Sequence, residues 1–565
     1  MSTVPTEAAI AEAVESRRAS RRWDWGVDAG ARRFWVRVLR GGLLALTGVF
    51  LALHFVHLGA DFPNNSPWMD WSKYTDEGWY GDAAIRHLQL GHWYVPGDFN
   101  PAAALPVWPT VEFLVFSLTG VSVVAARALT VAVLAAILVV AYMLVRRFAG
   151  REGSLAPEAA VVLLAVSPFC FVFTRLAILE PLLILLGLSS LLVASMVSRD
   201  ARDSRFRRWA PVTGLGLLLP LMVLTKTTAV FLVPSIAWML WASTGYRVRT
   251  FLRVGVPAAT IGAALWAAYY VLVVRPRFLE DYRYLFSANA YTGMTRENAV
   301  EVLANTVVDG MWMGRLMYPL AVALLVVALV WFRRGFRNPL VPSLVLWAAG
   351  YAAFLAYHNN LQPRYYLVVA VPLTLLIPVV VSEIFKGLAF SWGVGYRLVL
   401  VAASAGFVAL CVYDGLQMVA FVRTPEYTYA RAVKALRDVV AGDKGHSPLI
   451  LSISGSDISL MTGLPSICDD FGTMTLQDRA AAYKPGWYAT WNEVDDDKMD
   501  ALSPLFHLER VAAFPAFDDP ERNLLILYRL DPPQEEVPRK RRRKVVPKLL
   551  QTKLGQQPST VQLQH

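Results

Sequence analysis

Apolar runs of membrane length recur along most of this 565-residue chain. A helix needs about 20 apolar residues to cross the hydrocarbon core of a bilayer, and within that core its own hydrogen bonds satisfy the backbone. About eleven such runs precede Arg423, at residues 42–60, 121–145, 157–174, 180–198, 209–224, 227–244, 254–274, 312–332, 340–357, 363–383 and 396–418. Because 56% of all residues are hydrophobic, we predict an α-helical polytopic membrane protein with about eleven transmembrane helices.

Basic residues fall in alternate connections between these runs, and short loops rich in Lys and Arg stay cytoplasmic. The basic connections are 146–147, 199–208, 247–253, 333–337 and 386–397. The arginine-rich segment 1–41 joins them, so we expect a cytoplasmic N-terminus and no cleaved signal peptide. The opposite set faces outward and comprises loops 61–120 and 275–310 with turns 175–180, 225–227 and 358–362. The net charge of +11 then reflects cytoplasmic anchoring and not nucleic-acid binding.

The composition changes after Arg423. Residues 424–530 carry a helical pattern near 427–440 and strand-like runs at 449–453 and 523–528. This pattern predicts a small α/β domain, which an odd number of spans places outside the membrane. The chain then divides into the cytoplasmic segment 1–41, a transmembrane domain at 42–420, the extracytoplasmic domain 424–530 and a basic, disordered tail at 531–565 that contacts membrane lipids. Within the first outer loop, residues 105–118 fit an interfacial or re-entrant helix.

Asp76 and Glu77 form an acidic pair in the first outer loop. Ionisable residues near membrane depth are costly and are therefore functional candidates. The other candidates on the outer side are Arg175, Glu180, Lys226, His358 and Arg364. Cations can hold a lipid phosphate, and a carboxylate beside them can deprotonate a hydroxyl. Such a combination is suited to group transfer.

Each candidate also has a structural interpretation. Asp76 and Glu77 could be a solvated loop pair. Arg175 and Lys226 could reach the interface with their charged ends, with Glu180 as a structural partner of Arg175. Arg364, beside two tyrosines, could be an interfacial anchor, and His358 fits a polar surface residue better than a metal ligand.

Four segments resemble membrane glycosyltransferases of the C-type superfamily, specifically the branch of protein O-mannosyltransferases and aminoarabinose transferases. The resemblance covers roughly residues 40–420. The segments are Asp76-Glu77 followed by Trp79 and Tyr80, the Arg175-to-Glu180 turn, the Lys226 turn, and Gln362-Pro363-Arg364-Tyr365-Tyr366. The sequence departs from the family at Glu180, where the protein mannosyltransferases usually carry aspartate.

The resemblance implies inverting transfer of a hexose or pentose from a polyprenyl-phosphate donor to an acceptor hydroxyl on the outer face of the membrane. Asp76 would be the general base, and Glu77 would orient the site. Donor phosphate would be bound by Arg175, Lys226 and Arg364, with Glu180, His358 and Tyr365 as further site candidates.

The acceptor of such an enzyme would be a protein, a glycolipid or a polysaccharide. No metal would be required, although some superfamily members use a divalent ion. The short external domain favours a bacterial inner membrane.

Two other functions stay open at this point. A transporter or flippase of a lipid-linked substrate would place a series of charges through the middle of its spans and matched broken helices in two related halves, and the sequence shows neither pattern. A membrane-anchored partner-binding protein would carry its function in residues 424–530 and would not need Asp76. The chain shows no nucleotide-binding motif.

Overall fold

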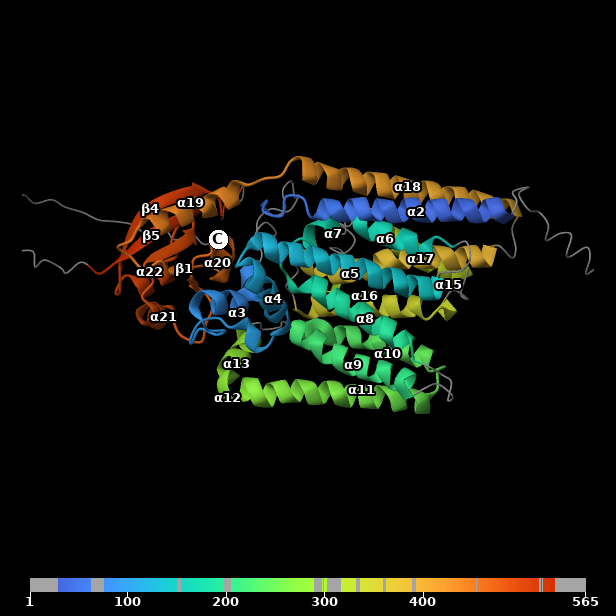
Figure 1. Ribbon diagram of the computed structural model, residues 1–565, viewed down its shortest axis with the longest axis horizontal. Coiled ribbons are helices and arrows are strands. Elements are labelled where there is room, and N and C mark those ends of the chain that lie inside the picture. Colours follow the sequence, from blue (N-terminus) through green and yellow to red (C-terminus); the bar gives the residue numbers. More distant parts are fainter. Residues whose placement is uncertain are drawn as a thin grey trace, which may run out of the picture.

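A computed structural model of the chain describes residues 29–61, 76–149, 154–197, 205–288, 297, 299–301, 317–331, 336–358, 362–388, 393–453, 455–517, 520 and 522–533. Long helices run side by side in one bundle, and a small α/β domain lies at one end of it (Figure 1). The predicted disordered tail beyond residue 533, residues 62–75 of the loop 61–120 and about half of the loop 275–310 lie outside the described residues.

The bundle contains every apolar run that the sequence predicts as a span. Its helices are α2 (Ala29–His54), α5 (Val123–Ala149), α6 (Ala156–Val166), α7 (Pro168–Phe173), α8 (Leu179–Ser195), α9 (Arg205–Thr225), α10 (Val233–Ser243), α11 (Val248–Tyr269), α15 (Met317–Trp331), α16 (Leu340–His358), α17 (Leu367–Leu388) and α18 (Gly393–Arg423). Among the described residues, six helical stretches are long and apolar enough to cross a membrane, and six shorter apolar helices accompany them. The prediction of a polytopic α-helical membrane protein is confirmed.

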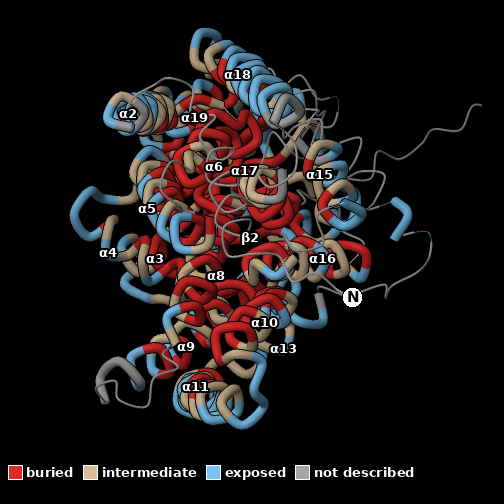
Figure 2. Tube along the Cα trace, turned by 90° about the vertical axis from the view of Figure 1, so that its right-hand side faces the viewer, coloured by how far each residue is buried: buried red, intermediate tan, exposed pale blue. Residues whose placement is uncertain are grey.

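Exposure divides the bundle into an outer and an inner set of helices. Helices α2, α11 and α18 lie at the periphery and are largely exposed, whereas α6, α8 and α17 are buried (Figure 2). The exposed side chains of the outer set are apolar, for example Leu44, Leu252 and Leu398. A large apolar surface of this kind is suited to contact with lipid.

Two of the predicted spans differ most from the observed helices. Helix α2 begins at Ala29 and not near Gly42, and Arg40 in its middle forms an ion pair with Glu158 of α6 at 3.4 Å. The predicted span 157–174 is divided into α6 and α7, because Ser167 is extended and its hydroxyl accepts a hydrogen bond from the Cys170 amide, which caps α7. Pro168 favours this extended conformation of the preceding residue.

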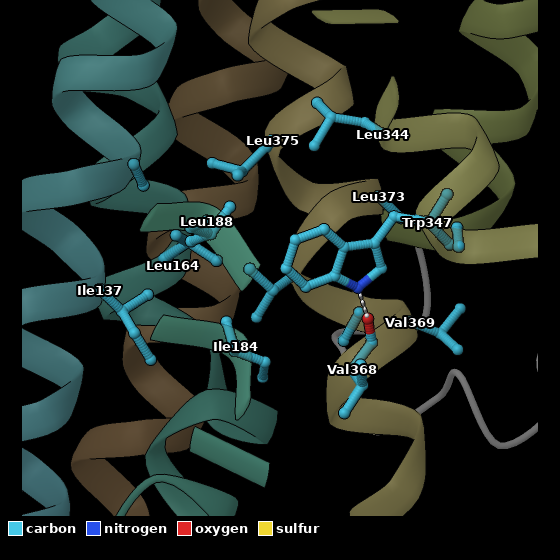
Figure 3. Packing of buried hydrophobic residues seen from close by; sticks show 14 of the residues in the cluster. Ile137, Leu164, Ile184, Leu188, Leu344, Trp347, Val368, Val369, Leu373 and Leu375 are labelled. Atoms are coloured by element: carbon cyan, nitrogen blue, oxygen red, sulfur yellow. Dashed lines mark hydrogen bonds between the residues drawn. The ribbon is translucent and has the colours of Figure 1, made fainter. Parts of the chain in front are cut away.

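Trp347 fixes three inner helices to one another. Its indole is fully buried in α16 and donates a hydrogen bond to the Val368 carbonyl of α17 at 2.8 Å, among leucines and isoleucines from neighbouring helices (Figure 3). Gly187 of α8 lies directly against the ring, where a Cβ atom would collide with it. Helices α8, α16 and α17 are thereby held in a fixed relation.

The C-terminal domain is a mixed sheet with helices. It contains α19 (Thr428–Gly442), β1 (Ile450–Ser452), α20 (Ser456–Thr462), β2 (Ser466–Cys468), α21 (Leu476–Tyr483), β3 (Trp487–Trp491), α22 (Asp496–Leu502), β4 (His507–Pro515) and β5 (Leu524–Asp531). The strand order is β2-β1-β3-β5-β4. Strand β1 pairs in parallel with β2 and β3, and β5 pairs antiparallel with β3 and β4. The predicted α/β class of this region is confirmed.

Helices α3 (Glu77–Leu90), α4 (Val107–Thr119) and α13 (Leu279–Ala288) lie between the bundle and this domain (Figure 1). A buried network, here called the junction cluster, joins α3 to the domain and consists of Asp82, Arg86, Asp98 and Arg479. Arg86 forms ion pairs with Asp82, at 2.6 Å, and with Asp98, while Arg479 binds the other oxygen of Asp98 at 2.9 Å. Charges that are buried and paired in this way fix the position of the domain against α3.

Candidate active site

Asp76 is the residue immediately before α3, at the helix N-terminus. Its carboxylate makes no capping hydrogen bond to the helix. Instead, Oδ2 accepts a hydrogen bond from the Arg364 guanidinium at 2.7 Å, and 27% of the Asp76 side chain is exposed. Its second oxygen has no partner among the described residues. Asp76 therefore keeps one oxygen that can accept a proton.

Arg364 lies in a short 3₁₀ turn, Pro363–Tyr366, that precedes α17. The side chain is buried, and its guanidinium lies 5.1 Å from the ring centre of Tyr365 and 5.9 Å from that of Tyr80. Burial raises the pKa of Tyr80 well above its usual value. Tyr80 is therefore a neutral phenol beside the Asp76–Arg364 pair and can donate a hydrogen bond.

A second ion pair lies next to the first, between Lys226 and Glu180. Lys226 follows α9, and Glu180 lies in the first turn of α8 with no exposed surface. The ammonium group contacts the carboxylate and lies 4.1 Å from the ring centre of Tyr365. Both cations thus lie against the same tyrosine, and we call Asp76, Glu180, Lys226, Arg364 and Tyr365 the site cluster.

Glu77 has different surroundings from Asp76. Its two oxygens accept hydrogen bonds from Arg127 at 2.9 and 2.6 Å, and the Ala177 amide donates another at 2.9 Å. Arg127 also donates to the carbonyls of Leu58 and Ala60, at 2.8 and 2.6 Å. Glu77 is therefore held in place and joins α3 to α5 and to the start of α8.

Arg127 is a site residue that the sequence analysis missed. It lies inside the apolar run 121–145, and a charged residue within such a run is itself a signal of function or pairing. Its partner could not be read from the sequence, because fifty positions separate Arg127 from Glu77.

The structure places Arg175 apart from the site cluster. Its guanidinium donates to the carbonyls of Val56 and His57 and lies 4.3 Å from the ring centre of Phe171. Together with Arg127 and His57, Arg175 lines a cavity beside the ends of α2, α7 and α18. The cation thus lines the same cavity as Arg127, the partner of Glu77, and its contacts among the described residues include neither Arg364 nor Lys226.

His358 is the last residue of α16, and its ring centre lies 6.3 Å from that of Tyr365. It is therefore at the margin of the site cluster. Within the part of the chain that the structure describes, no three His, Cys, Asp or Glu side chains are grouped so that they could hold a metal ion.

This arrangement, a helical bundle with a small α/β domain at one end, is shared with solved structures of other proteins. The chain is similar in structure to ArnT from Cupriavidus metallidurans bound to undecaprenyl phosphate, with a TM-score of 0.53 and 15% identity over 86% of this chain and 98% of that chain. It is also similar to the apo state of the same protein, with a TM-score of 0.52 and 14% identity over 87% and 98% of the two chains. No protein-family model matches the chain, and no curated protein matches it by sequence. The fold expected from the resemblance is confirmed.

Proposed function

We propose that this protein transfers a sugar from a polyprenyl-phosphate donor to an acceptor hydroxyl at the outer face of the membrane, with inversion. The observation that carries this proposal is the pairing of a half-open Asp76 carboxylate with Arg364, beside Lys226 and Tyr365. The shared fold supports it, because one of the similar structures, ArnT, is bound to undecaprenyl phosphate.

The chemistry follows from the two kinds of charge in the site cluster. The free oxygen of Asp76 takes the proton of the acceptor hydroxyl, whose oxygen attacks the anomeric carbon of the sugar. The bond between that carbon and the phosphate oxygen breaks, and polyprenyl phosphate leaves with the electron pair. Arg364 and Lys226 stabilise the negative charge that develops on the leaving phosphate.

The remaining side chains support this step. Glu180 holds Lys226 in place through their ion pair. Glu77 orients the start of α3 through Arg127. The ring face of Tyr365 lies against both cations, which stabilises their charged forms in a largely apolar environment.

The orientation is part of the proposal. The residues of the site cluster lie at helix ends on the side of the bundle that carries the α/β domain, and the described residues Arg147, Arg249 and Arg337 lie at or next to the other helix ends. By the positive-inside rule, the N-terminus is cytoplasmic and the domain at 424–530 is extracytoplasmic. The proposed location is a bacterial inner membrane, with a protein, glycolipid or polysaccharide as the acceptor.

The test is a transfer assay in liposomes with a panel of radiolabelled polyprenyl-phosphate hexoses and pentoses and with membrane acceptors. We expect the wild type to transfer label, and Asp76→Asn to slow transfer by about 10²- to 10⁴-fold because the general base is lost. Asp500→Asn, the same change at an exposed position of α22, is the matched control and should behave as wild type. We also expect transfer to continue in the presence of a metal chelator.

Two results would contradict the proposal. One is full transfer activity from a folded Asp76→Asn variant. The other is the absence of transfer from folded wild type with every donor, which would instead favour a partner-binding function of the α/β domain.

A further inference from the structure

Helix α3 begins with backbone amides that lack partners within the helix, as every helix does. An aspartate at the N-cap position usually accepts a hydrogen bond from the second or third helical amide. Asp76 occupies that position and Gly78 is the second helical residue, yet the Asp76 carboxylate makes no capping bond and faces Arg364. The amide of Gly78 therefore needs another acceptor.

That acceptor is Asp457, which lies 379 positions further along the chain in the α/β domain. Its buried carboxylate accepts the hydrogen bond from the Gly78 amide. The approach is so close that a Cβ atom on residue 78 would collide with the Ser456 carbonyl and the Asp457 amide. Glycine at position 78 is therefore required for α20 to reach the first turn of α3.

We infer that Asp457 is a positioning residue that caps α3 and so leaves the Asp76 carboxylate free to act as the base. This inference rests on the proposed function. Asp76 cannot serve well both as the helix cap and as the general base. A carboxylate that caps a helix is turned toward the backbone amides, and the helix N-terminus stabilises it as an anion. With the cap supplied by Asp457, Asp76 retains its contact with Arg364.

The inference also makes the α/β domain part of the catalytic arrangement. Asp457 reaches Gly78 only while the domain is seated on α3, and the junction cluster maintains that contact through Arg86 and Arg479. Ser456, next to Asp457, adds a hydrogen bond to Asp82. Removal of the Asp457 carboxylate alone leaves these contacts in place, so the capping role can be tested without undocking the domain.

The test combines transfer kinetics with hydrogen–deuterium exchange of the peptide that covers residues 76–80. The variants are Asp457→Ala, Asp457→Asn, which keeps an accepting oxygen, and Thr475→Ala. Thr475 caps α21 in the same domain by accepting from the Asp478 amide at 3.2 Å, so its removal is a matched loss of a helix cap that leaves the contact between Asp457 and Gly78 in place.

We expect Asp457→Ala to speed exchange in the first turn of α3 and to lower kcat by about 10- to 100-fold, as for a small displacement of a catalytic group. The KM for the donor and the stoichiometry of polyprenyl-phosphate binding should not change, because Arg364 and Lys226 remain. Asp457→Asn should retain most of the wild-type kcat, and Thr475→Ala should change neither exchange at residues 76–80 nor kcat.

The inference is overturned if Asp457→Ala exchanges and turns over as wild type, if Thr475→Ala loses as much kcat, or if Asp457→Asn is as slow as Asp457→Ala. Exchange is measured without any substrate. Altered exchange in Asp457→Ala together with a wild type that transfers no sugar would therefore reject the proposed function and leave the capping contact standing.

Discussion

Two aspartates close to α3 differ in how many hydrogen-bond partners their carboxylate oxygens have. Asp98, in the junction cluster, has no exposed surface and accepts hydrogen bonds from the Phe99 amide, Arg479 and the Cys468 amide on one oxygen, and binds Arg86 with the other. Asp76, in the site cluster, has one ion pair and an exposed fraction of 27%. A saturated carboxylate has no capacity left for a substrate, whereas Asp76 has an oxygen that can take a proton.

The same difference separates the two clusters as a whole. In the junction cluster, both oxygens of the Asp82 carboxylate and both oxygens of the Asp98 carboxylate have partners, which suits a structural role. In the site cluster, the Glu180 carboxylate has one oxygen without a partner among the described residues, and the Asp76 carboxylate is open on one side. Saturation of the carboxylate oxygens, and not burial of charge alone, therefore distinguishes the structural cluster from the functional one.

The comparison predicts that the two aspartates fail in different ways when each is changed to asparagine. Asp98→Asn removes the charge that Arg86 and Arg479 share, and breaking a buried ion pair costs about 3–5 kcal/mol. We expect a clear fall in the midpoint of thermal unfolding in detergent. Asp76→Asn should unfold close to the wild-type temperature, and equal midpoints for the two variants would contradict the distinction.

Lys226 tests whether the site cluster binds phosphate or only pairs charges. Changing Lys226 alone would leave Glu180 buried and unpaired, so the informative variant is the double change Lys226→Met with Glu180→Gln, which removes both charges. We expect kcat/KM for the donor to fall by about 10²- to 10³-fold, as when one preorganised donor to a developing anion is lost.

The control for that variant is Lys226→Arg, which keeps a cation in the pair with Glu180. It should retain more activity than the double variant, and both proteins should fold. Wild-type kcat/KM in the folded double variant would show that Lys226 serves only the packing of α8 against α9.

The junction cluster should also make stability depend on pH. Burial raises the pKa of Asp82 to about 7, although Arg86 and Ser456 both contact its carboxylate. In the unfolded chain the pKa of an aspartate is about 3.9, so the folded protein binds this proton more tightly. The contribution of this tighter proton binding to the free energy of unfolding is present in full at low pH and is lost as the pH rises through about 7.

We therefore expect the midpoint of thermal unfolding to fall by a few degrees between about pH 5 and about pH 8. Asp82→Asn removes the titrating group and should reduce this dependence. A variant with the same pH dependence as wild type would show that Asp82 does not titrate in this range.

Much of the fold follows from local sequence patterns, because hydrophobic length and period decide where helices and strands form. The apolar runs became helices, and the strand-like runs near 449–453 and 523–528 became β1 and β5. The exception at Ser167-Pro168 also has a local cause, since an extended residue before proline interrupts the span between α6 and α7.

The site could be predicted only in part. Charged residues in turns between apolar runs marked Asp76, Lys226 and Arg364, because charge near membrane depth is costly wherever it occurs. Which charges face one another depends on contacts between distant segments, such as Arg127 with Glu77 and Asp457 with Gly78. A single sequence carries no signal for these pairs.

We expect the smallest effect on sugar transfer from a change at Arg175. The resemblance implies a donor-phosphate ligand there, whereas the structure places the guanidinium against the carbonyls of Val56 and His57. Loss of such hydrogen bonds costs about 1 kcal/mol, so we expect Arg175→Ala to lower kcat/KM for the donor by about fivefold, far less than the Lys226 double variant. The measurement is the same transfer assay with varied donor concentration. A loss as large as that of the double variant would place Arg175 with the phosphate ligands and would require the cavity beside α2 and α18 to be part of the donor site.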